Sequence, residues 1–161
     1  MPKAIHHGVR IGHVHLKVAD LDRAIHFYRD VLGFELTQRS GNQAAFLSAG
    51  GYHHHIGLNT WESEDGSPPP PGSTGLYHLA IAYPNRAELG DAVRRVLHAG
   101  IPLEGASDHG VSEAIYLRDA DGNGVELYWD RPREQWPRTA NGKLAMTTEP
   151  LDLNQLLREA A

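Results

Sequence analysis

The sequence predicts an α+β fold in which two βαβββ modules pair and their strands form a curved mixed sheet around a cleft. Three observations carry this prediction. Each half of the chain opens with a strand-like run, each run leads into a capped amphipathic helix, and the two halves align in one register. We expect the modules at about residues 8–61 and 75–131, inside one domain that covers residues 1–133. Residues 134–161 form a C-terminal extension.

The first module is expected to begin with a strand over residues 11–18, where side chains alternate in character. Asp20 suits a helix N-cap, and Gly33 suits the residue that ends the helix. Between them, apolar residues recur at helical spacing: Leu21, Ala24, Ile25, Tyr28, Val31 and Leu32. Strands are then expected over residues 34–39, 43–47 and 53–60.

The second module repeats this order. A strand is expected over residues 77–82, Asn85 stands at the cap position, and an apolar helical stripe ends near Gly100. Short strands are predicted over residues 102–105, 113–118 and 124–129, with a tight hairpin at residues 121–124 before the last one.

The two halves superpose when His78 is placed on His13. The same shift aligns four further pairs: Leu16 with Ile81, Asp20 with Asn85, Val31 with Val96, and Leu32 with Leu97. Agreement of so many positions in one register indicates an internal duplication.

Two segments lie outside the repeated units. The proline-rich stretch 62–75 favours extended chain, so it is either a surface connector or a flap over the cleft. Within the extension, residues 151–158 are predicted to form a short helix with an apolar side, which docks on its own domain or on a partner subunit.

Composition excludes several classes of protein. The chain has 161 residues, a formal charge of −5 and no basic cluster, which argues against nucleic acid as a partner. Cysteine is absent, so disulfides and thiolate metal sites are excluded. No signal peptide and no run as long as a membrane span is visible, so no membrane partner is predicted and the cytoplasm is the expected compartment.

Three residues in strand-like runs suggest a metal site: His13, His78 and Glu126. Because side chains alternate along a strand, each of the three is expected on the face away from its helix, where the cleft lies. Two imidazoles and one carboxylate hold a divalent metal on one side and leave the other side open. The sequence therefore predicts a metal-binding cleft.

Both ends of this region resemble the signatures of the vicinal oxygen chelate superfamily, which includes glyoxalases, bleomycin-resistance proteins and extradiol dioxygenases. The opening signature is carried by residues 12–21 and 27–34, and the closing one by residues 119–128. Within the superfamily, residues 52–61 and 126–132 look most like catechol 2,3-dioxygenase-type proteins (type I extradiol dioxygenases).

The resemblance implies a role for each candidate residue. It implies His13, His78 and Glu126 as ligands of Fe(II), with Mn(II) or another divalent metal as the alternative. It implies an acid–base role for a histidine of the 53–55 run, either His54 or His55, and His54 is preferred. It also implies that Tyr116 and His109 contact the substrate.

The activity implied is Fe(II)-dependent extradiol ring cleavage of a small catechol-type aromatic diol by dioxygen, as in aromatic compound catabolism. A homodimer is expected for a single paired domain, and the helix predicted in the tail is the feature that supports it. One alternative is a glyoxalase-type metal-dependent isomerase, lyase or thiol transferase. Such enzymes usually place a fourth, carboxylate ligand near the 53–55 strand, where histidines stand here. The other alternative is a non-enzymatic, bleomycin-resistance-like binding protein, which does not need the three metal ligands.

Overall fold

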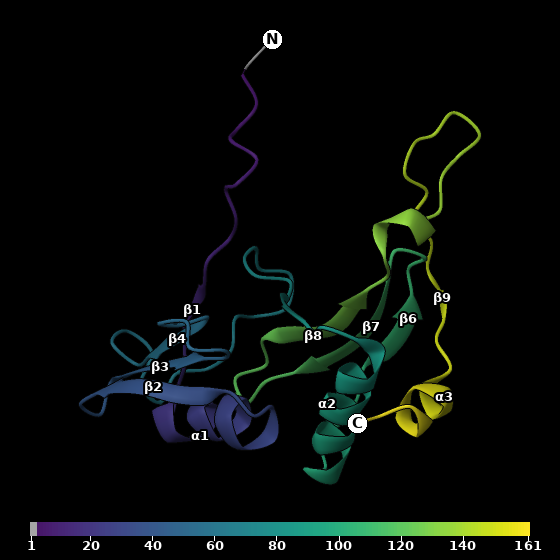
Figure 1. Ribbon diagram of the computed structural model, residues 1–161. Helices are drawn as coiled ribbons and strands as arrows, with labels where there is room; N and C mark the ends of the chain where they lie inside the picture. Colours follow the sequence, from purple (N-terminus) through teal and green to yellow (C-terminus); the bar gives the residue numbers. More distant parts are fainter. Residues whose placement is uncertain (1–2) are drawn as a thin grey trace.

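The fold was analysed in a computed structural model that describes residues 3–161, so the first two residues of the predicted domain lie outside the described residues. Two βαβββ modules follow each other along the chain, and the helices of both modules lie on the same side of the strands (Figure 1). The first module contains β1 (Val14–Lys17), α1 (Leu21–Ile25), η1 (His26–Val31), β2 (Glu35–Ser40), β3 (Ala44–Ser48) and β4 (Ile56–Asn59).

The second module and the extension complete the chain. The second module contains β5 (Leu79–Ala82), α2 (Arg86–His98), β6 (Gly105–Asp108), β7 (Ser112–Arg118) and β8 (Gly124–Asp130). The extension contains the short 3₁₀ turn η2 (Arg133–Gln135), β9 (Glu149–Pro150) and α3 (Leu153–Arg158). The predicted α+β class and the order of elements are confirmed.

The strands are hydrogen bonded as two mixed sheets, one from each module. The first sheet has the order β1-β4-β3-β2, and the second has the order β5-β8-β7-β6-β9. In each sheet the opening strand pairs in parallel with the last strand of its module, β1 with β4 and β5 with β8. β1 and β5 are therefore both edge strands, which leaves no ladder between the modules.

The duplication is visible in local geometry. β1 begins directly after His13, and β5 begins directly after His78. Each helix is then capped in the same way, because the side chain of Asp20 accepts a hydrogen bond from the Arg23 amide and that of Asn85 accepts one from the Glu88 amide. Both histidines thus precede their strands by one residue rather than lying inside them.

The first helix changes its winding after one turn. α1 passes into the π-helical segment η1, in which the Leu32 amide donates to the carbonyl of Phe27, five residues earlier. The helix ends at Gly33, whose φ of +88° is the left-handed conformation that favours glycine at this position. The predicted helix over residues 21–32 is therefore present, but its second half is not α-helical.

A hairpin of the second module ties the two modules together. The buried Tyr28 hydroxyl donates to Asp119 Oδ2 at 2.7 Å, and burial followed by the charge of Asp119 raises the pKa of Tyr28 well above its usual value. The neighbouring Asp121 carboxylate accepts from the Ala19 amide at 2.9 Å and from Arg23 at 3.0 Å. Because these contacts join α1 and its flanks to the β7–β8 hairpin, they hold the two modules in one relative position.

The remaining differences lie at the module ends. β6 begins at Gly105, later than the strand predicted over residues 102–105, although the Glu104 amide already donates to the Tyr116 carbonyl at 2.7 Å. Residues 62–75 contain turns but neither helix nor strand. The predicted C-terminal helix is α3, and it packs on α2 of its own chain. This contact needs Gly90, because a Cβ there would lie 2.8 Å from the carbonyl oxygen of Leu156.

Among residues 3–161, no helix is long and apolar enough to cross a membrane.

Candidate functional site

Two of the predicted metal ligands converge in the second sheet. His78 directly precedes β5, and Glu126 lies in the adjoining strand β8, opposite Ala80. The His78 Nε2 atom is 2.8 Å from Glu126 Oε2. Gly124 makes this approach feasible, because a Cβ at that position would lie 3.0 Å from the Cβ of His78 and would also meet the Tyr77 carbonyl oxygen.

The two substrate-side residues adjoin this pair. Tyr116 in β7 is the direct cross-strand partner of Glu126, and its ring centre is 5.9 Å from that of His78. The Tyr116 hydroxyl is 2.7 Å from Nε2 of His109, which follows β6. Burial, and next the negative charge of Glu126, raise the pKa of Tyr116, so this side chain stays a neutral phenol at neutral pH.

The histidines of the first module form a separate group. The ring of His13 lies 4.3 Å from that of His54, centre to centre, and Nδ1 of His54 is 2.7 Å from Nδ1 of His53. Burial, followed by the charges of His13 and His53, lowers the pKa of His54 and favours its neutral form. His55 instead turns toward Ser48 Oγ, at 3.1 Å.

The candidate ligands thus occupy two places. Across residues 3–161, no three histidine, aspartate or glutamate side chains are grouped so that they could hold a metal ion. His13 stays with His54, while His78 and Glu126 form a pair on the other module. Sequence reasoning missed the role of Gly124, which it places at the end of the hairpin and the start of the last strand, although a glycine within a strand often signals a close backbone approach.

The His78–Glu126 pair fits two positions of a metal centre. An imidazole nitrogen and a carboxylate oxygen are donors that Fe(II) and similar ions accept, and here they face the same point. Two histidines of the first module have polar side-chain partners, since Nε2 of His15 contacts Asn59 and Nδ1 of His55 contacts Ser48. In contrast, Nδ1 of His78 is buried without a hydrogen-bond partner among the described residues. His78 is thus held only through Nε2, by Glu126, and a metal centre built on this pair would need a third donor.

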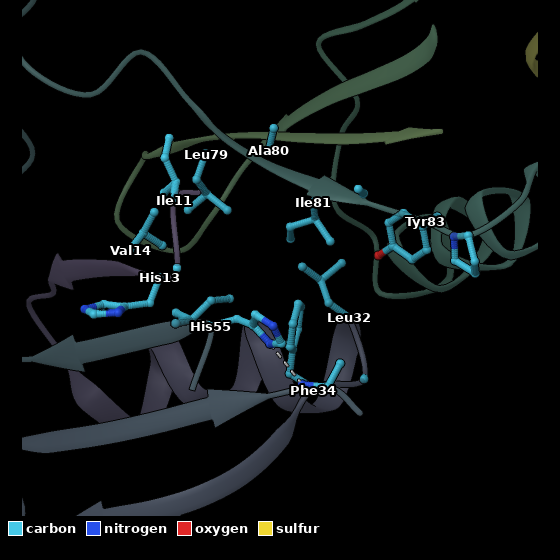
Figure 2. A pocket seen from close by; sticks show the side chains of 16 residues that line it. Ile11, His13, Val14, Leu32, Phe34, His55, Leu79, Ala80, Ile81 and Tyr83 are labelled. Carbon is cyan, nitrogen blue, oxygen red and sulfur yellow. Dashed lines mark hydrogen bonds between the residues drawn. The ribbon is translucent and has the colours of Figure 1, made fainter. Parts of the chain in front are cut away.

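An apolar pocket of about 470 Å³ lies where the two modules meet. Figure 2 shows Ile81 of β5 pointing toward Leu32 of the first module, with the ring of His55 below them. His13 lies at one end of the same pocket. The junction between the edge strands is consequently lined by apolar side chains of both modules.

Comparisons of this chain with known proteins agree on one family. Residues 10–127 match the Glyoxalase/Bleomycin resistance protein/Dioxygenase superfamily. The chain is 42% identical over 158 residues to a catechol-2,3-dioxygenase of Bacillus subtilis, covering 98% of this chain and 54% of that protein. It is 32% identical over 123 residues to biphenyl-2,3-diol 1,2-dioxygenase 3 of Rhodococcus globerulus, covering 75% of this chain and 63% of that protein. The chain thus spans between half and two thirds of the length of these two relatives.

A solved structure of a lactoylglutathione lyase from Agrobacterium tumefaciens superposes with a TM-score of 0.59 at 28% sequence identity. This superposition covers 77% of the present chain and 96% of that chain. It supports the paired βαβββ architecture.

Proposed function

This chain belongs to the glyoxalase/bleomycin resistance protein/dioxygenase superfamily, and we propose that within it the protein is an Fe(II)-dependent extradiol dioxygenase that opens the ring of a small aromatic diol. Two relatives with dioxygenase names support this choice over the other activities of the superfamily. The observation that carries the proposal is the convergence of His78 and Glu126 at 2.8 Å beside Tyr116.

The donor set favours a dioxygenase over a glyoxalase-type enzyme. In the first sheet, the position that corresponds to Glu126 is Gly57, because Gly57 pairs with His15 as Glu126 pairs with Ala80. A second carboxylate is therefore missing at the matched place. His13, His78 and Glu126 supply a three-ligand set, and when bound, Fe(II) supplies open positions for the diol and for dioxygen.

The other residues handle protons and orientation. Tyr116, held as a neutral phenol, forms a hydrogen bond with an oxygen of the diol and orients it. His54, whose pKa is lowered, is neutral at physiological pH and accepts a proton from the diol before returning it to the product. Acid–base assistance of this kind contributes about 10²–10⁴-fold in rate.

His13 of a second copy completes the ligand set in this proposal. Within one chain the contacts of Asp119 and Asp121 hold the modules in place, with His13 beside His54 rather than beside Glu126. The edge strands β1 and β5 offer free hydrogen-bonding groups to another chain. A symmetric homodimer would place His13 of each copy at the His78–Glu126 pair of the other.

Purification under anaerobic conditions, followed by Fe(II), air and a panel of catechols, tests the activity. A yellow ring-opened product in the wild type and its absence in His78→Ala are the expected results. Failure of the wild-type protein to take up Fe(II) would sink the proposal.

Mixing two inactive variants tests the shared site. His13→Ala and Glu126→Ala are each expected to be inactive. After the subunits exchange, half of the dimers are mixed and each has one intact site, so about a quarter of the wild-type activity should return. If no activity returns although mixed dimers form, the three ligands come from one chain.

A further inference from the structure

The extension contributes a strap to the second sheet, which we define as residues 133–150. It starts with η2, folds back on itself through a bridge between Arg138 and Leu144, and ends as β9 on the edge of β6. Figure 1 shows it rising beyond the ends of β6–β8 and returning along the outer edge of the sheet. The strap lies outside residues 10–127, the part that matches the family.

The strap forms two hydrogen bonds with His109. The amide of Thr147 donates to the backbone carbonyl of His109 at 3.1 Å. In the opposite direction, Nδ1 of His109 lies 2.9 Å from the carbonyl oxygen of Thr147. Since a carbonyl oxygen only accepts hydrogen bonds, Nδ1 of His109 must carry the proton.

This tautomer sets the direction of the next hydrogen bond. Neutral His109 with its proton on Nδ1 has a bare Nε2, and the Tyr116 hydroxyl lies 2.7 Å from that atom. The hydroxyl therefore donates to His109. The phenol oxygen of Tyr116 then turns its lone pairs outward, on the face that also holds His78 and Glu126.

We infer that the strap is a positioning element of the site: the Thr147 carbonyl fixes the tautomer of His109, and His109 fixes the Tyr116 hydroxyl so that its oxygen accepts a hydrogen bond from a hydroxyl group of the substrate. This inference rests on the proposed function for the identity of the substrate as an aromatic diol. Tyr116 is then a hydrogen-bond acceptor, and the group that it selects is a substrate hydroxyl that still carries its proton.

The tautomer of His109 can be measured directly by ¹⁵N NMR on the full-length protein, with the resonance assigned by its loss in His109→Gln. The expected state is one tautomer with the proton on Nδ1. It should persist in Tyr116→Phe and in Thr148→Val, which removes a hydroxyl 3.4 Å from Nδ1, because the Thr147 carbonyl sets it. A proton on Nε2 in the wild type, or a switch in either variant, would overturn the inference.

Two glycine variants test the effect of displacing the strap. Gly110 has a φ of +73°, and a Cβ there would lie 2.8 Å from Cγ of Pro137 and 3.3 Å from Oγ1 of Thr147, both in the strap. Gly100, which lies outside the strap, has a φ of +72° with nothing within 4 Å of such a Cβ. Gly110→Ala and Gly100→Ala thus carry similar backbone strain, but only the first pushes on the strap.

Gly110→Ala is expected to give a mixture of His109 tautomers and a KM for catechol raised about tenfold with kcat changed less than about twofold. Gly100→Ala should match the wild type in all three quantities. A single unchanged tautomer in Gly110→Ala would contradict the inference. The NMR result does not need turnover, so a failure of the dioxygenase proposal and a failure of this inference are distinguishable.

Discussion

Gly57 in β4 holds the place in the first sheet that Glu126 in β8 holds in the second. Gly57 pairs with His15, Glu126 pairs with Ala80, and the duplication aligns His15 with Ala80. A Cβ on Gly57 would lie only 2.9 Å from Nδ1 of His15, so an imidazole fills the room that a carboxylate uses in the second sheet. The two modules consequently offer unequal donors to a metal, although they share one fold.

Replacing Gly57 by alanine should destabilise the protein because the new methyl group meets the His15 ring in a buried strand. We expect a loss of about 1–3 kcal/mol in the free energy of unfolding, measured with a denaturant. In a double-mutant cycle, Gly57→Ala should cost clearly less in the presence of His15→Ala, which removes the ring. Simple additivity of the two changes would show that the ring is not the obstacle.

Glu126→Gln should weaken Fe(II) binding by at least about 100-fold. Losing a carboxylate that binds the metal directly costs more metal affinity than losing a residue that only supports a ligand. An anaerobic titration against a competing chelator measures the affinity. Glu62→Gln is the control, because Glu62 is an exposed carboxylate that pairs with Lys17 at 3.7 Å. Equal Fe(II) affinity in wild type and Glu126→Gln would argue against Glu126 as a ligand.

Tyr28→Phe should lower the free energy of unfolding by about 1–3 kcal/mol, because it removes a buried donor from the Asp119 carboxylate between the modules. Denaturant unfolding at neutral pH measures this loss. Tyr77→Phe changes the same group at a site that is 87% exposed, and it should leave stability within about 0.5 kcal/mol of the wild type. Equal effects of the two substitutions would mean that the Tyr28–Asp119 bond does not hold the modules together.

The ion pair of Arg131 and Asp108 should make stability depend on pH in the acid range. The Arg131 guanidinium lowers the pKa of Asp108, while burial acts in the opposite direction. A lowered pKa in the folded state means that the stabilisation is present above the usual carboxyl pKa of about 3.9 and is lost as pH falls through the lower folded value.

Arg131→Met is therefore expected to cost about 2 kcal/mol at pH 7, where Asp108 and Glu113 both lose a partner. The difference from the wild type should shrink once the pH falls below the usual carboxyl pKa of about 3.9 and through the lower folded value. Unfolding curves at neutral pH and in this acid range measure it. A difference that stays constant with pH would mean that Arg131 acts through packing rather than through charge.

Much of each module could be predicted from local patterns. The caps Asp20 and Asn85 and the alternating runs after His13 and His78 depend on residues close in sequence, and these predictions are confirmed. The division into two sheets could not be predicted, because it depends on which strand edges meet across more than sixty residues of chain. The π-helical segment was missed as well, since its apolar spacing also fits an α-helix.

The sequence by itself determined the duplicated α+β unit and the candidate ligands His13, His78 and Glu126, because periodicity, capping and side-chain chemistry are local properties. Only the tertiary structure decided which of those candidates meet. The parallel pairing of β5 with β8 brings His78 to Glu126, while the contacts of Asp119 and Asp121 keep His13 with its own module. The hydrogen bond between His109 and the Thr147 carbonyl could not be predicted either, because a backbone carbonyl is a group that every residue carries.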